Sequence, residues 1–316
     1  MHQALYRKYR PITFDDVYGQ QHITDVLRYE VEHGSVSHAY LFCGSRGTGK
    51  TTCAKILARA INCKAPKNGS PCGQCAACRE IAAGTATDVI EMDAASNNGV
   101  DAIRQICDEA SYTPAMLNRK VYIIDEVHML SQGAFNALLK TIEEPPEHVV
   151  FILATTELQK LPATIISRCQ RFDFHRIDVK VIARRLAYIA EQENMALSED
   201  AAILLARQAQ GGMRDAIGLM ELCGAGGSDI TAEQVRELLG LSGYDAAAKA
   251  LTYVAQEDIG ALFGIISDVV SSAKDISVYW QELLSFVRDM LICKYAPDPA
   301  AYLDLTVQDL EILTKA

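Results

Sequence analysis

The sequence predicts an α/β domain built on a central parallel sheet over residues 1–178, followed by a small helical domain over 179–242 and a further helical segment over 243–316. Two patterns carry this prediction. Up to residue 178, short apolar runs typical of buried parallel strands alternate with segments whose apolar residues recur at helical spacing. After that point such runs disappear, and amphipathic helical patterns follow one another at about 179–193, 199–210, 214–223 and 231–240, with more from 246 onward.

The composition is that of an ordinary globular protein, with 49% hydrophobic and 22% charged residues in a chain of 316. No apolar run reaches transmembrane length, and the N-terminal stretch MHQALYRK has no hydrophobic signal core. We therefore expect a cytoplasmic protein with no membrane partner. In that compartment the ten cysteines are expected to be reduced thiols or metal ligands rather than disulfides.

The net charge of −10 is unevenly distributed. Residues 1–180 carry 20 basic and 20 acidic side chains, whereas the rest of the chain carries 10 and 20. A nucleic acid would therefore have to meet a local set of Lys and Arg side chains, because phosphate contact draws on local charge. The acidic second half is expected to face protein or solvent.

The first 62 residues predict an irregular segment, two helices and one strand. Residues 7–20 mix basic, aromatic and turn residues, and on composition we expect an irregular surface segment. Residues 22–33 suit a helix with one apolar face, residues 39–43 suit a buried strand, and residues 53–62 suit a second helix.

Between that strand and that helix, residues 44–51 read GSRGTGKT, which fits the pattern G-x-x-x-x-G-K-[ST] at every fixed position. In such a loop the glycines let backbone N–H groups point at phosphate oxygens, Lys50 reaches the β- and γ-phosphates, and the Thr51 hydroxyl is placed to ligate Mg²⁺. The helix N-terminus adds partial positive charge. The alternative is a glycine-rich turn that matches by chance, and the flanking strand and helix argue against it.

Four cysteines, Cys63, Cys72, Cys75 and Cys78, fall within 16 residues. Tetrahedral Zn²⁺ is bound by four such thiolates, and a closed structural site leaves no open position for catalysis. An iron–sulfur cluster is the rival, but the bacterial ferredoxin run places its last cysteine downstream and before a proline. We favour zinc. The remaining cysteines are scattered singly and are expected to be small buried apolar residues: Cys43, Cys53, Cys107, Cys169, Cys223 and Cys293.

A pair of acids follows the apolar strand predicted at residues 120–124. Such a run is typical of a central parallel strand whose carboxyl end meets a ligand. Asp125 would then lie in the Mg²⁺ shell and Glu126 would polarise the attacking water. The alternative, an ordinary strand followed by solvated acids, is disfavoured by the phosphate loop upstream. A neighbouring strand is expected at 88–93, followed by a helix at 100–110.

The last part of the α/β domain adds three candidate residues. A helix is expected at 131–143, capped by Ser131 and ended by the prolines that follow. The strand at 149–154 then delivers Thr155 and Thr156 to its end. Arg168 stands between Ser167 and Cys169, where it suits either a solvated side chain or one that reaches a phosphate. Residues 171–174 suit an edge strand.

Taken together, these residues resemble the gamma/tau family of clamp-loader subunits of bacterial DNA polymerase III, a branch of the AAA+ ATPases, over essentially the whole chain. The most specific pieces are YRKYRP at 6–11 with VYGQ at 17–20, the phosphate loop, the cysteine insertion, DEVHMLS at 125–131, NALLKTIEEPP at 136–146 and SRC at 167–169. The phosphate loop alone would indicate only an NTPase.

The resemblance implies an AAA+ nucleotide-binding domain with a zinc-binding insertion at 63–78, a helical lid domain and a helical collar that holds subunits in a ring. Thr156 is similar to the first sensor, with Thr155 as the other register, and Arg214 to the second sensor over the γ-phosphate of its own subunit. Arg168 is similar to an arginine finger given in trans, which makes hydrolysis depend on assembly. The further residues implied to bind ATP are Ala4, Tyr6, Arg7, Arg10, Pro11, Val17, Gly47, Thr48, Gly49, Lys50, Thr51 and Thr52.

The resemblance also implies partners. They are the delta and delta prime subunits and further gamma/tau copies in a hetero-oligomeric ring, the sliding clamp, and primer–template DNA. ATP binding would open the clamp, and hydrolysis would release it closed on DNA. Lys140, Arg104 and the helix from Ser131 are the candidates for contacting the DNA backbone, whereas residues 97–99 read NNG where family members can be basic. As part of DNA polymerase III, the chain would fall under DNA-directed DNA polymerases, which are nucleotidyltransferases.

Two other hypotheses stay open at this point. A scaffold subunit similar to delta prime would share the cysteine insertion and SRC, but it need not keep Lys50 and Thr51. Another AAA+ machine, such as a branch-migration motor, is disfavoured by the same insertion. The helical pattern runs up to Ala316, which predicts that the chain is a piece of a longer protein and leaves a tau-type tail open.

Overall fold

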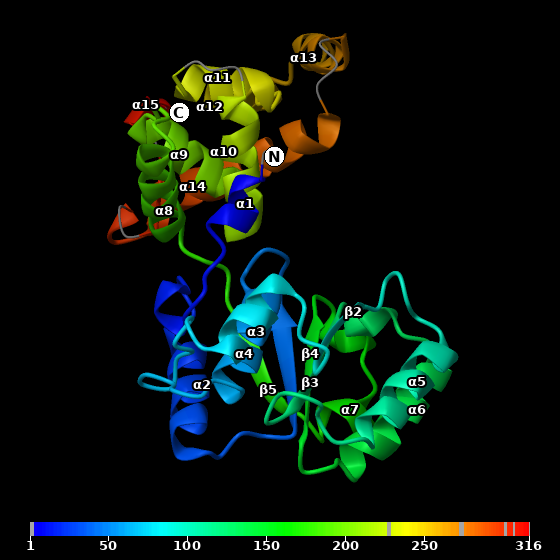
Figure 1. Ribbon diagram of the computed structural model, residues 1–316. Helices are drawn as coiled ribbons and strands as arrows, with labels where there is room; N and C mark the ends of the chain where they lie inside the picture. Colours follow the sequence, from blue (N-terminus) through cyan, green and yellow to red (C-terminus); the bar gives the residue numbers. More distant parts are fainter. Residues whose placement is uncertain (1–2, 226–228, 272–274, 300–301, 306, 316) are drawn as a thin grey trace. The chain divides into compact units, whose positions relative to one another are not determined.

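A computed structural model describes residues 3–225, 229–271, 275–299, 302–305 and 307–315. The contacts within the chain divide it into two compact units (Figure 1). One consists of Tyr6–Ile177 and Gly211–Arg214, and the other of Met1–Leu5, Asp178–Gln210 and Asp215–Ala316.

The first unit is built on a five-stranded sheet in which every neighbouring pair is parallel and the strand order is β2-β3-β4-β1-β5. The predicted α/β class and central parallel sheet are confirmed. Because all strands run the same way, their carboxyl ends meet at one edge of the sheet, which is where ligands bind in such folds. The strands are β1 (Ala39–Gly44), β2 (Val89–Asp93), β3 (Lys120–Asp125), β4 (Val149–Thr155) and β5 (Gln170–Phe174).

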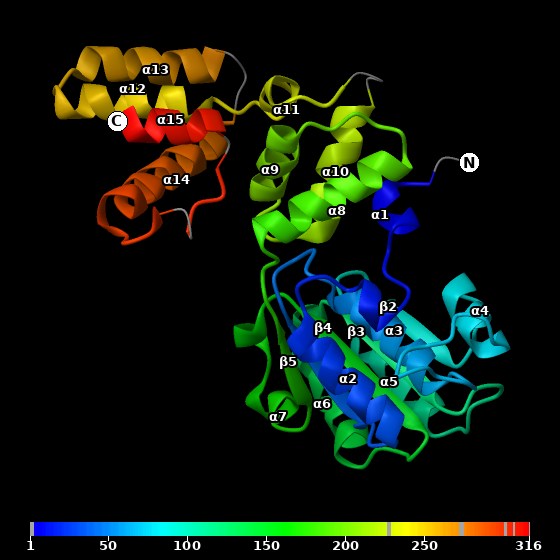
Figure 2. The ribbon, with the colours of Figure 1, turned by 90° about the vertical axis from the view of Figure 1, so that its left-hand side faces the viewer.

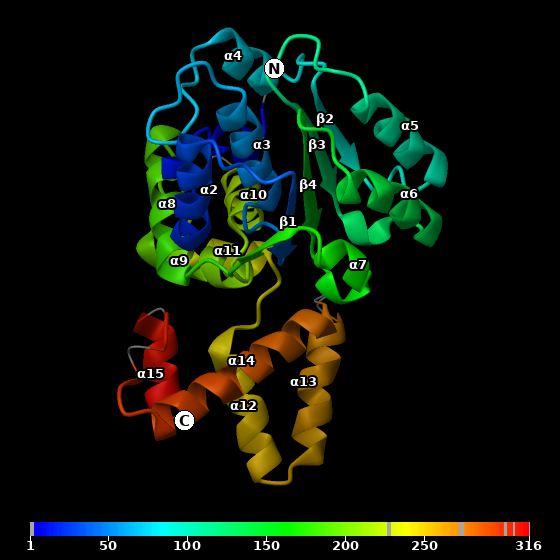
Figure 3. The same ribbon diagram turned by 90° about the horizontal axis from the view of Figure 1, so that it is seen from below.

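Helices cover both faces of this sheet (Figure 3). Side chains alternate along each strand, so Tyr40 and Phe42 pack with the helices of one face, and Leu41 packs with those of the other. All three are fully buried. This explains why the strands read as continuous apolar runs. One face carries α2 (Gln21–His33) and α3 (Lys50–Ile61), and the other carries α5 (Val100–Ala110), α6 (Gln132–Glu143) and α7 (Ala163–Ile166).

The segment ahead of the first strand is less irregular and less exposed than expected. It contains a short helix, α1 (Leu5–Lys8), and a 3-10 turn, η1 (Phe14–Asp16). Phe14 and Val17 are buried against the α2 and α3 face of the sheet, at 1% and 6% exposure. The expectation of an exposed segment was wrong at these two positions, because two apolar side chains among many polar ones carry no periodic signal.

The second unit is helical, as predicted (Figure 2). A buried carboxylate ties three of its helices together: Asp289 accepts hydrogen bonds from the Tyr244 hydroxyl at 2.5 Å and from the Arg207 guanidinium at 3.0 Å. The division of this unit at residues 242 and 243 stays a prediction. Its helices are α8 (Val179–Gln192), α9 (Glu199–Gln208), α10 (Met213–Gly224), α11 (Ala232–Leu238), α12 (Gly243–Ala255), α13 (Ile259–Ser271), α14 (Ile276–Tyr295) and α15 (Val307–Lys315). The first two residues of α10, Met213 and Arg214, belong to the first unit.

Two sequence expectations about the whole chain can be compared with the described residues. None of the helices in this part of the chain combines the length and the apolar character that a membrane span needs. Three of the single cysteines, Cys43, Cys53 and Cys223, are buried as expected, whereas the other three are only half-buried: Cys107, Cys169 and Cys293.

Candidate nucleotide-binding site

The phosphate loop leaves the carboxyl end of β1 and enters α3, and its glycines are required by the backbone. Gly44 has φ 148°, and a Cβ there would lie 2.4 Å from the Phe174 carbonyl oxygen. Gly47 and Gly49 have φ 78° and 107°, a region that residues with a side chain rarely adopt. The backbone of the loop therefore favours glycine at both fixed positions of the motif, 44 and 49, and at the variable position 47.

Lys50 opens α3 and folds back across the loop. Its Nζ donates to the carbonyl oxygens of Gly44 at 2.8 Å and Ser45 at 2.9 Å. Only 6% of the residue is exposed, and this burial lowers the pKa of Lys50, while Glu126 and Asp125 oppose the shift. The ammonium group is thus held inside the loop where a phosphate chain would lie.

The two residues expected to ligate magnesium lie in direct contact. The Thr51 hydroxyl, on α3, donates to Asp125 Oδ2 at the end of β3, at 2.7 Å. Mg²⁺ in nucleotide sites takes oxygen ligands and usually only one or two of them from protein carboxylates, with phosphates and waters completing the shell. A hydroxyl and a carboxylate that meet beside the phosphate loop fit this requirement.

Glu126 follows Asp125 and is fixed by the neighbouring strand. Its backbone is left-handed, with φ 48° and ψ 44°. The Thr156 hydroxyl donates to Glu126 Oε2 at 2.9 Å, and the Thr156 N–H approaches the same oxygen at 3.3 Å. Thr155 is fully buried and instead contacts His128. Of the two adjacent threonines that could act as the first sensor, it is therefore Thr156 that contacts Glu126.

The N-terminal residues expected to bind nucleotide divide between the two units. Arg10 Nε donates to the Thr52 hydroxyl at 3.3 Å, and burial lowers the pKa of Arg10. The Arg214 guanidinium lies over the Tyr6 ring, 4.7 Å from its centroid. A hydrogen bond from Arg7 lowers the pKa of Tyr6.

The other residues expected to bind nucleotide differ in their surroundings. Pro11 is half-buried and Val17 is part of the core. Thr48 donates to the Ser45 carbonyl at 2.8 Å, whereas Ala4 belongs to the other unit.

Arg168 lies at the amino ends of the strands, whereas the phosphate loop lies at their carboxyl ends. It precedes β5, in which Gln170 pairs with Tyr40 and Phe174 pairs with Gly44. The strand rises about 3.3 Å per residue, so the stretch from Gln170 to Phe174 alone separates Arg168 from the loop by more than about 13 Å. Its guanidinium contacts Glu143 Oε1 at 2.7 Å, the Thr164 carbonyl at 3.0 Å and the Ser167 hydroxyl at 3.2 Å. Arg168 therefore does not reach the phosphate loop of its own unit.

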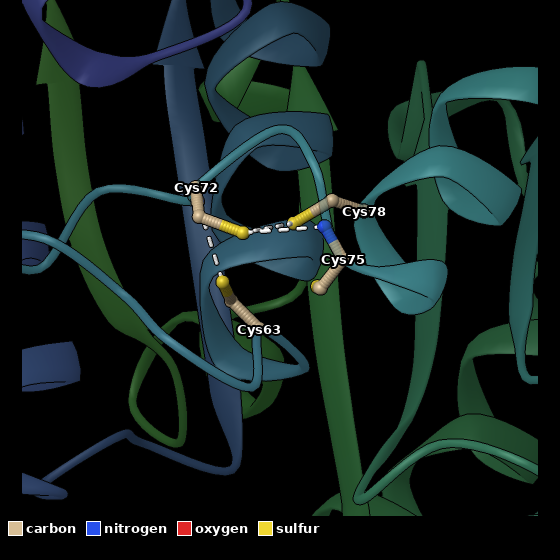
Figure 4. A group of neighbouring side chains, drawn as sticks. All are labelled: Cys63, Cys72, Cys75 and Cys78. Carbon is tan, nitrogen blue, oxygen red and sulfur yellow. Dashed lines mark hydrogen bonds between the residues drawn. The ribbon is translucent and has the colours of Figure 1, made fainter.

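The four clustered cysteines converge between α3 and β2 (Figure 4). Their sulfur atoms all lie within 4.8 Å of one another, and the Cys72 and Cys78 sulfurs are 4.0 Å apart. A tetrahedral ion with metal–sulfur bonds of about 2.3 Å would place them roughly 3.8 Å apart. Backbone N–H groups of Gln74 and Cys75 lower the pKa of Cys72 to about 6, which favours the thiolate, whereas burial raises the pKa of Cys63. The cluster fits a four-thiolate metal ion.

The residues expected to contact DNA are exposed. Arg104 on α5 forms an ion pair with Asp101 at 3.3 Å, and Lys140 lies on the outer side of α6. Ser131 caps α6 by accepting the N–H of Ala134, and its own N–H donates to the carbonyl of Asn98 at 3.2 Å. The start of α6 is thus joined to the NNG segment.

Two polar residues beside Glu126 and one helix beside the cysteines were not predicted from the sequence. The His128 ring contacts Thr155, Glu126 and Glu157. His128 lies in the DEVHMLS segment but had no predicted role, and Glu157 lies outside every predicted motif. The helix α4 (Ala76–Ala83) starts within the cysteine cluster. It is only eight residues long, too short for a clear periodic signal.

A parallel sheet flanked by helices, with a phosphate loop at the carboxyl end of β1 and an acid pair at the end of β3, defines the class of P-loop NTPases. Structures of the RuvB protein of Thermotoga maritima share this fold. A structure of a single-residue variant of RuvB gives a TM-score of 0.56 at 20% identity, covering 89% of this chain and 91% of that one. The structure titled RuvB Holliday junction branch migration motor gives 0.55 at 20% identity, with 86% and 87% covered.

Sequence comparisons identify the family within that class. Three models match in succession: DNA polymerase III, delta subunit, over residues 19–178; DNA polymerase III clamp loader subunit, ATPase lid domain, over 181–222; and DNA polymerase III subunits gamma and tau domain III, over 230–316. The chain belongs to the gamma/tau clamp-loader family of DNA polymerase III. The expected resemblance is confirmed.

Individual relatives agree with this family. DNA polymerase III subunit tau of Bacillus subtilis is 47% identical over 299 residues, covering 94% of this chain and 53% of that one. The tau subunit of Escherichia coli is 41% identical, with 94% and 46% covered. The gamma subunit of Buchnera aphidicola is 40% identical, with 94% and 80% covered. The chain thus spans about half the length of the tau relatives.

The same comparisons correct one expectation. The matched models describe clamp-loader subunits and an ATPase lid, and give no support for placing this chain among the DNA-directed DNA polymerases or nucleotidyltransferases. Membership in a polymerase assembly does not imply that each subunit carries polymerase chemistry.

Proposed function

We propose that this chain is an ATP-hydrolysing motor subunit of the DNA polymerase III clamp loader, which uses ATP to open the sliding clamp and load it on primed DNA. One observation carries the proposal. Lys50, the Thr51 and Asp125 pair and the Glu126 and Thr156 pair meet beside the phosphate loop. A hydrogen bond of 2.7 Å holds the first pair together and one of 2.9 Å holds the second. A subunit that only bound nucleotide would not need the acid held by a second strand.

In this proposal each residue has a separate task. Lys50 would exchange its two carbonyl partners for the β- and γ-phosphates, because an ammonium group bonds more strongly to a charged oxygen. Glu126 would accept a proton from the attacking water while Thr156 holds its carboxylate in place. Mg²⁺, when bound near Thr51 and Asp125, would neutralise charge that develops on the phosphates.

The proposal also assigns the partners. Since Arg168 lies at the far edge of the sheet, we assign it to the nucleotide of a neighbouring subunit, where its charge would stabilise the transition state. Turnover would then require a ring, formed with delta, delta prime and further gamma/tau copies. The sliding clamp and the DNA backbone, contacted through Lys140, Arg104 and the start of α6, would stimulate that turnover. Arg214, from the start of α10, would contact the γ-phosphate of its own subunit.

For the cysteine cluster we propose a structural Zn²⁺ ion held by Cys63, Cys72, Cys75 and Cys78. The ion would close the loop between α3 and α4 without taking part in hydrolysis. Metal analysis of the purified chain should give about one zinc per chain, and a Cys72→Ser, Cys75→Ser variant should lose it. Iron with labile sulfide at the same sites would favour the iron–sulfur rival instead.

A scaffold role similar to that of delta prime is the alternative function. The decisive measurement is ATP hydrolysis by this chain mixed with delta and delta prime, with and without clamp and primed DNA. The motor proposal expects strong stimulation by clamp and DNA together. Nucleotide binding without stimulated turnover, in a complex shown to be assembled, would support the scaffold role.

A further inference from the structure

A histidine that the proposed mechanism does not use lies beside the catalytic acid. His128 follows β3 in a 3-10 turn, η2 (Val127–Met129), and only 6% of its side chain is exposed. Its Nδ1 lies 3.1 Å from the Thr155 hydroxyl and 3.4 Å from Glu126 Oε2, and its Nε2 lies 3.2 Å from Glu157 Oε1. The ring therefore bridges the turn after β3 and the turn after β4.

The hydrogen bonds around the ring assign its proton. The Thr155 hydroxyl oxygen already accepts the N–H of Glu157 at 3.0 Å, so the hydroxyl proton is available to donate to Nδ1. Glu157 Oε1 also accepts from Lys160 Nζ at 2.8 Å and is a carboxylate that can only accept, because the hydrogen bond from Lys160 lowers the pKa of Glu157. Nε2 must then be the donor. A neutral imidazole with its proton on Nε2 satisfies both contacts.

This state has a consequence for the acid. With Nδ1 acting as an acceptor, the ring offers no proton to Glu126, and Thr156 supplies the hydrogen bonds that fix Oε2. The ring instead holds Thr155 and Glu157, the residues on either side of Thr156. It thereby determines where the Thr156 hydroxyl meets the carboxylate.

We propose that His128 is a positioning residue for ATP hydrolysis. Its ring acts as the neutral Nε2–H tautomer and holds residues 155–157 so that Thr156 orients Glu126. This inference rests on the hydrolysis proposed above. Protonation of the ring would place an N–H on Nδ1, 3.4 Å from Glu126 Oε2. The carboxylate would then be engaged by an imidazolium and become a weaker base towards water. The charged groups that face the ring are Glu126 and Glu157, with Lys160 behind Glu157.

The tautomer can be measured without any activity. Nitrogen-15 NMR of the labelled chain at neutral pH should show one imidazole with a protonated Nε2 and an unprotonated Nδ1, assigned because it disappears in His128→Gln. The Glu157→Gln variant should perturb that signal. A protonated Nδ1 in the neutral ring, or rapid exchange between tautomers, would overturn the inference whatever the subunit does in its complex.

The kinetic test uses two substitutions that each retain half of the bridge, measured in the complex with delta, delta prime, clamp and primed DNA. His128→Asn keeps an acceptor for Thr155, and His128→Gln keeps a donor for Glu157. We expect each to lower kcat about 10-fold, the range found when a supporting hydrogen bond is lost, while ATP affinity stays within about 2-fold. His33→Asn, on the exposed end of α2, is the control and should match the wild type.

The split between kcat and ATP affinity separates positioning from a structural role. Both substitutions should lower kcat while ATP affinity and the melting temperature stay close to those of the wild type. Unchanged kcat in both variants, or a loss of ATP affinity as large as the loss of kcat, would overturn the inference. If the wild-type complex binds ATP without hydrolysing it, the proposed function fails, and the tautomer measurement alone then decides whether the ring is held as described.

Discussion

The two ends of the parallel strands, here called the carboxyl edge and the amino edge of the sheet, carry different parts of the proposed chemistry. At the carboxyl edge, Lys50, Thr51, Asp125, Glu126 and Thr156 are partly or fully buried. Hydrogen bonds join Thr51 to Asp125, Thr156 to Glu126 and Lys50 to carbonyl oxygens of the loop. At the amino edge, Arg168 stands on the surface, with 37% of its side chain exposed, and is held by a surface ion pair with Glu143. The first edge is organised within the chain, whereas the second displays a cation that surface contacts hold only weakly.

The energies of the two edges should differ accordingly. Exposed ion pairs contribute about 0–1 kcal/mol, because solvent screens them and two long side chains lose freedom. A buried polar group left without its partner costs about 1–3 kcal/mol. Approach of a charged nucleotide on a neighbouring subunit could therefore separate Arg168 from Glu143, while the carboxyl edge would stay assembled.

The largest effect on ATP binding is expected at the carboxyl edge, from Lys50→Ala. Loss of the buried ammonium group removes the charge that would meet the β- and γ-phosphates, and ATP affinity should fall by at least about 100-fold, the equivalent of two charge-assisted hydrogen bonds. Titration with a fluorescent ATP analogue measures this. Lys67→Ala, on the exposed loop of the cysteine insertion, should bind as the wild type does. Near-normal binding by Lys50→Ala would remove the phosphate-loop assignment.

The matching change at the amino edge is Arg168→Ala. We expect unchanged ATP binding by the isolated chain and a loss of assembly-dependent hydrolysis of roughly 1,000-fold, the lower range for an arginine finger. Arg168→Lys should not restore the rate, because a lysine lacks the planar fork. Arg171→Ala, an exposed neighbour paired with Asp173, serves as control. Normal turnover by an assembled Arg168→Ala complex would refute the assignment in trans.

A smaller effect should separate the two adjacent threonines. Thr156→Val keeps the shape of the side chain but removes the hydroxyl that holds Glu126, so kcat should fall about 10-fold while the melting temperature is nearly unchanged. Thr155→Val removes a buried hydroxyl that also contacts His128, so we expect a similar fall in kcat together with a loss of about 1–3 kcal/mol in the free energy of unfolding. Steady-state kinetics and thermal denaturation of both variants check this. An unchanged kcat in Thr156→Val beside a reduced kcat in Thr155→Val would show that the other register is the catalytic one.

The smallest effect is expected from Glu143→Gln, which releases Arg168 from its own surface. Since an exposed ion pair contributes about 1 kcal/mol at most, assembly-dependent hydrolysis should rise by no more than about 5-fold, with stability unchanged. Glu144→Gln, the neighbouring exposed acid, is the matched control. A fall in the rate as large as that of Arg168→Ala would mean that Glu143 positions the arginine rather than merely pairing with it.

Local pattern was enough to predict most of the backbone. The apolar runs at 39–43, 120–124 and 149–154 became strands, and the helical patterns before and after residue 178 became helices, because the spacing of apolar residues reports the period of each element. The phosphate loop and the four cysteines were visible for a related reason. Each is a contiguous segment whose function depends on residues close together in the chain.

What sequence alone determined is therefore the class of the fold, the elements, the phosphate loop, the spacing of the four clustered cysteines and, by resemblance, the family. Tertiary structure alone decided that Thr51 touches Asp125, that Thr156 rather than Thr155 holds Glu126, and that His128 bridges to Glu157. It also decided that Arg168 lies at the amino edge, away from the phosphate loop. This position follows from the strand order β2-β3-β4-β1-β5, which places β5 beside β1, and from the register of that pair. Strand order depends on which long-range pairings close the core, and no local spacing of residues encodes it.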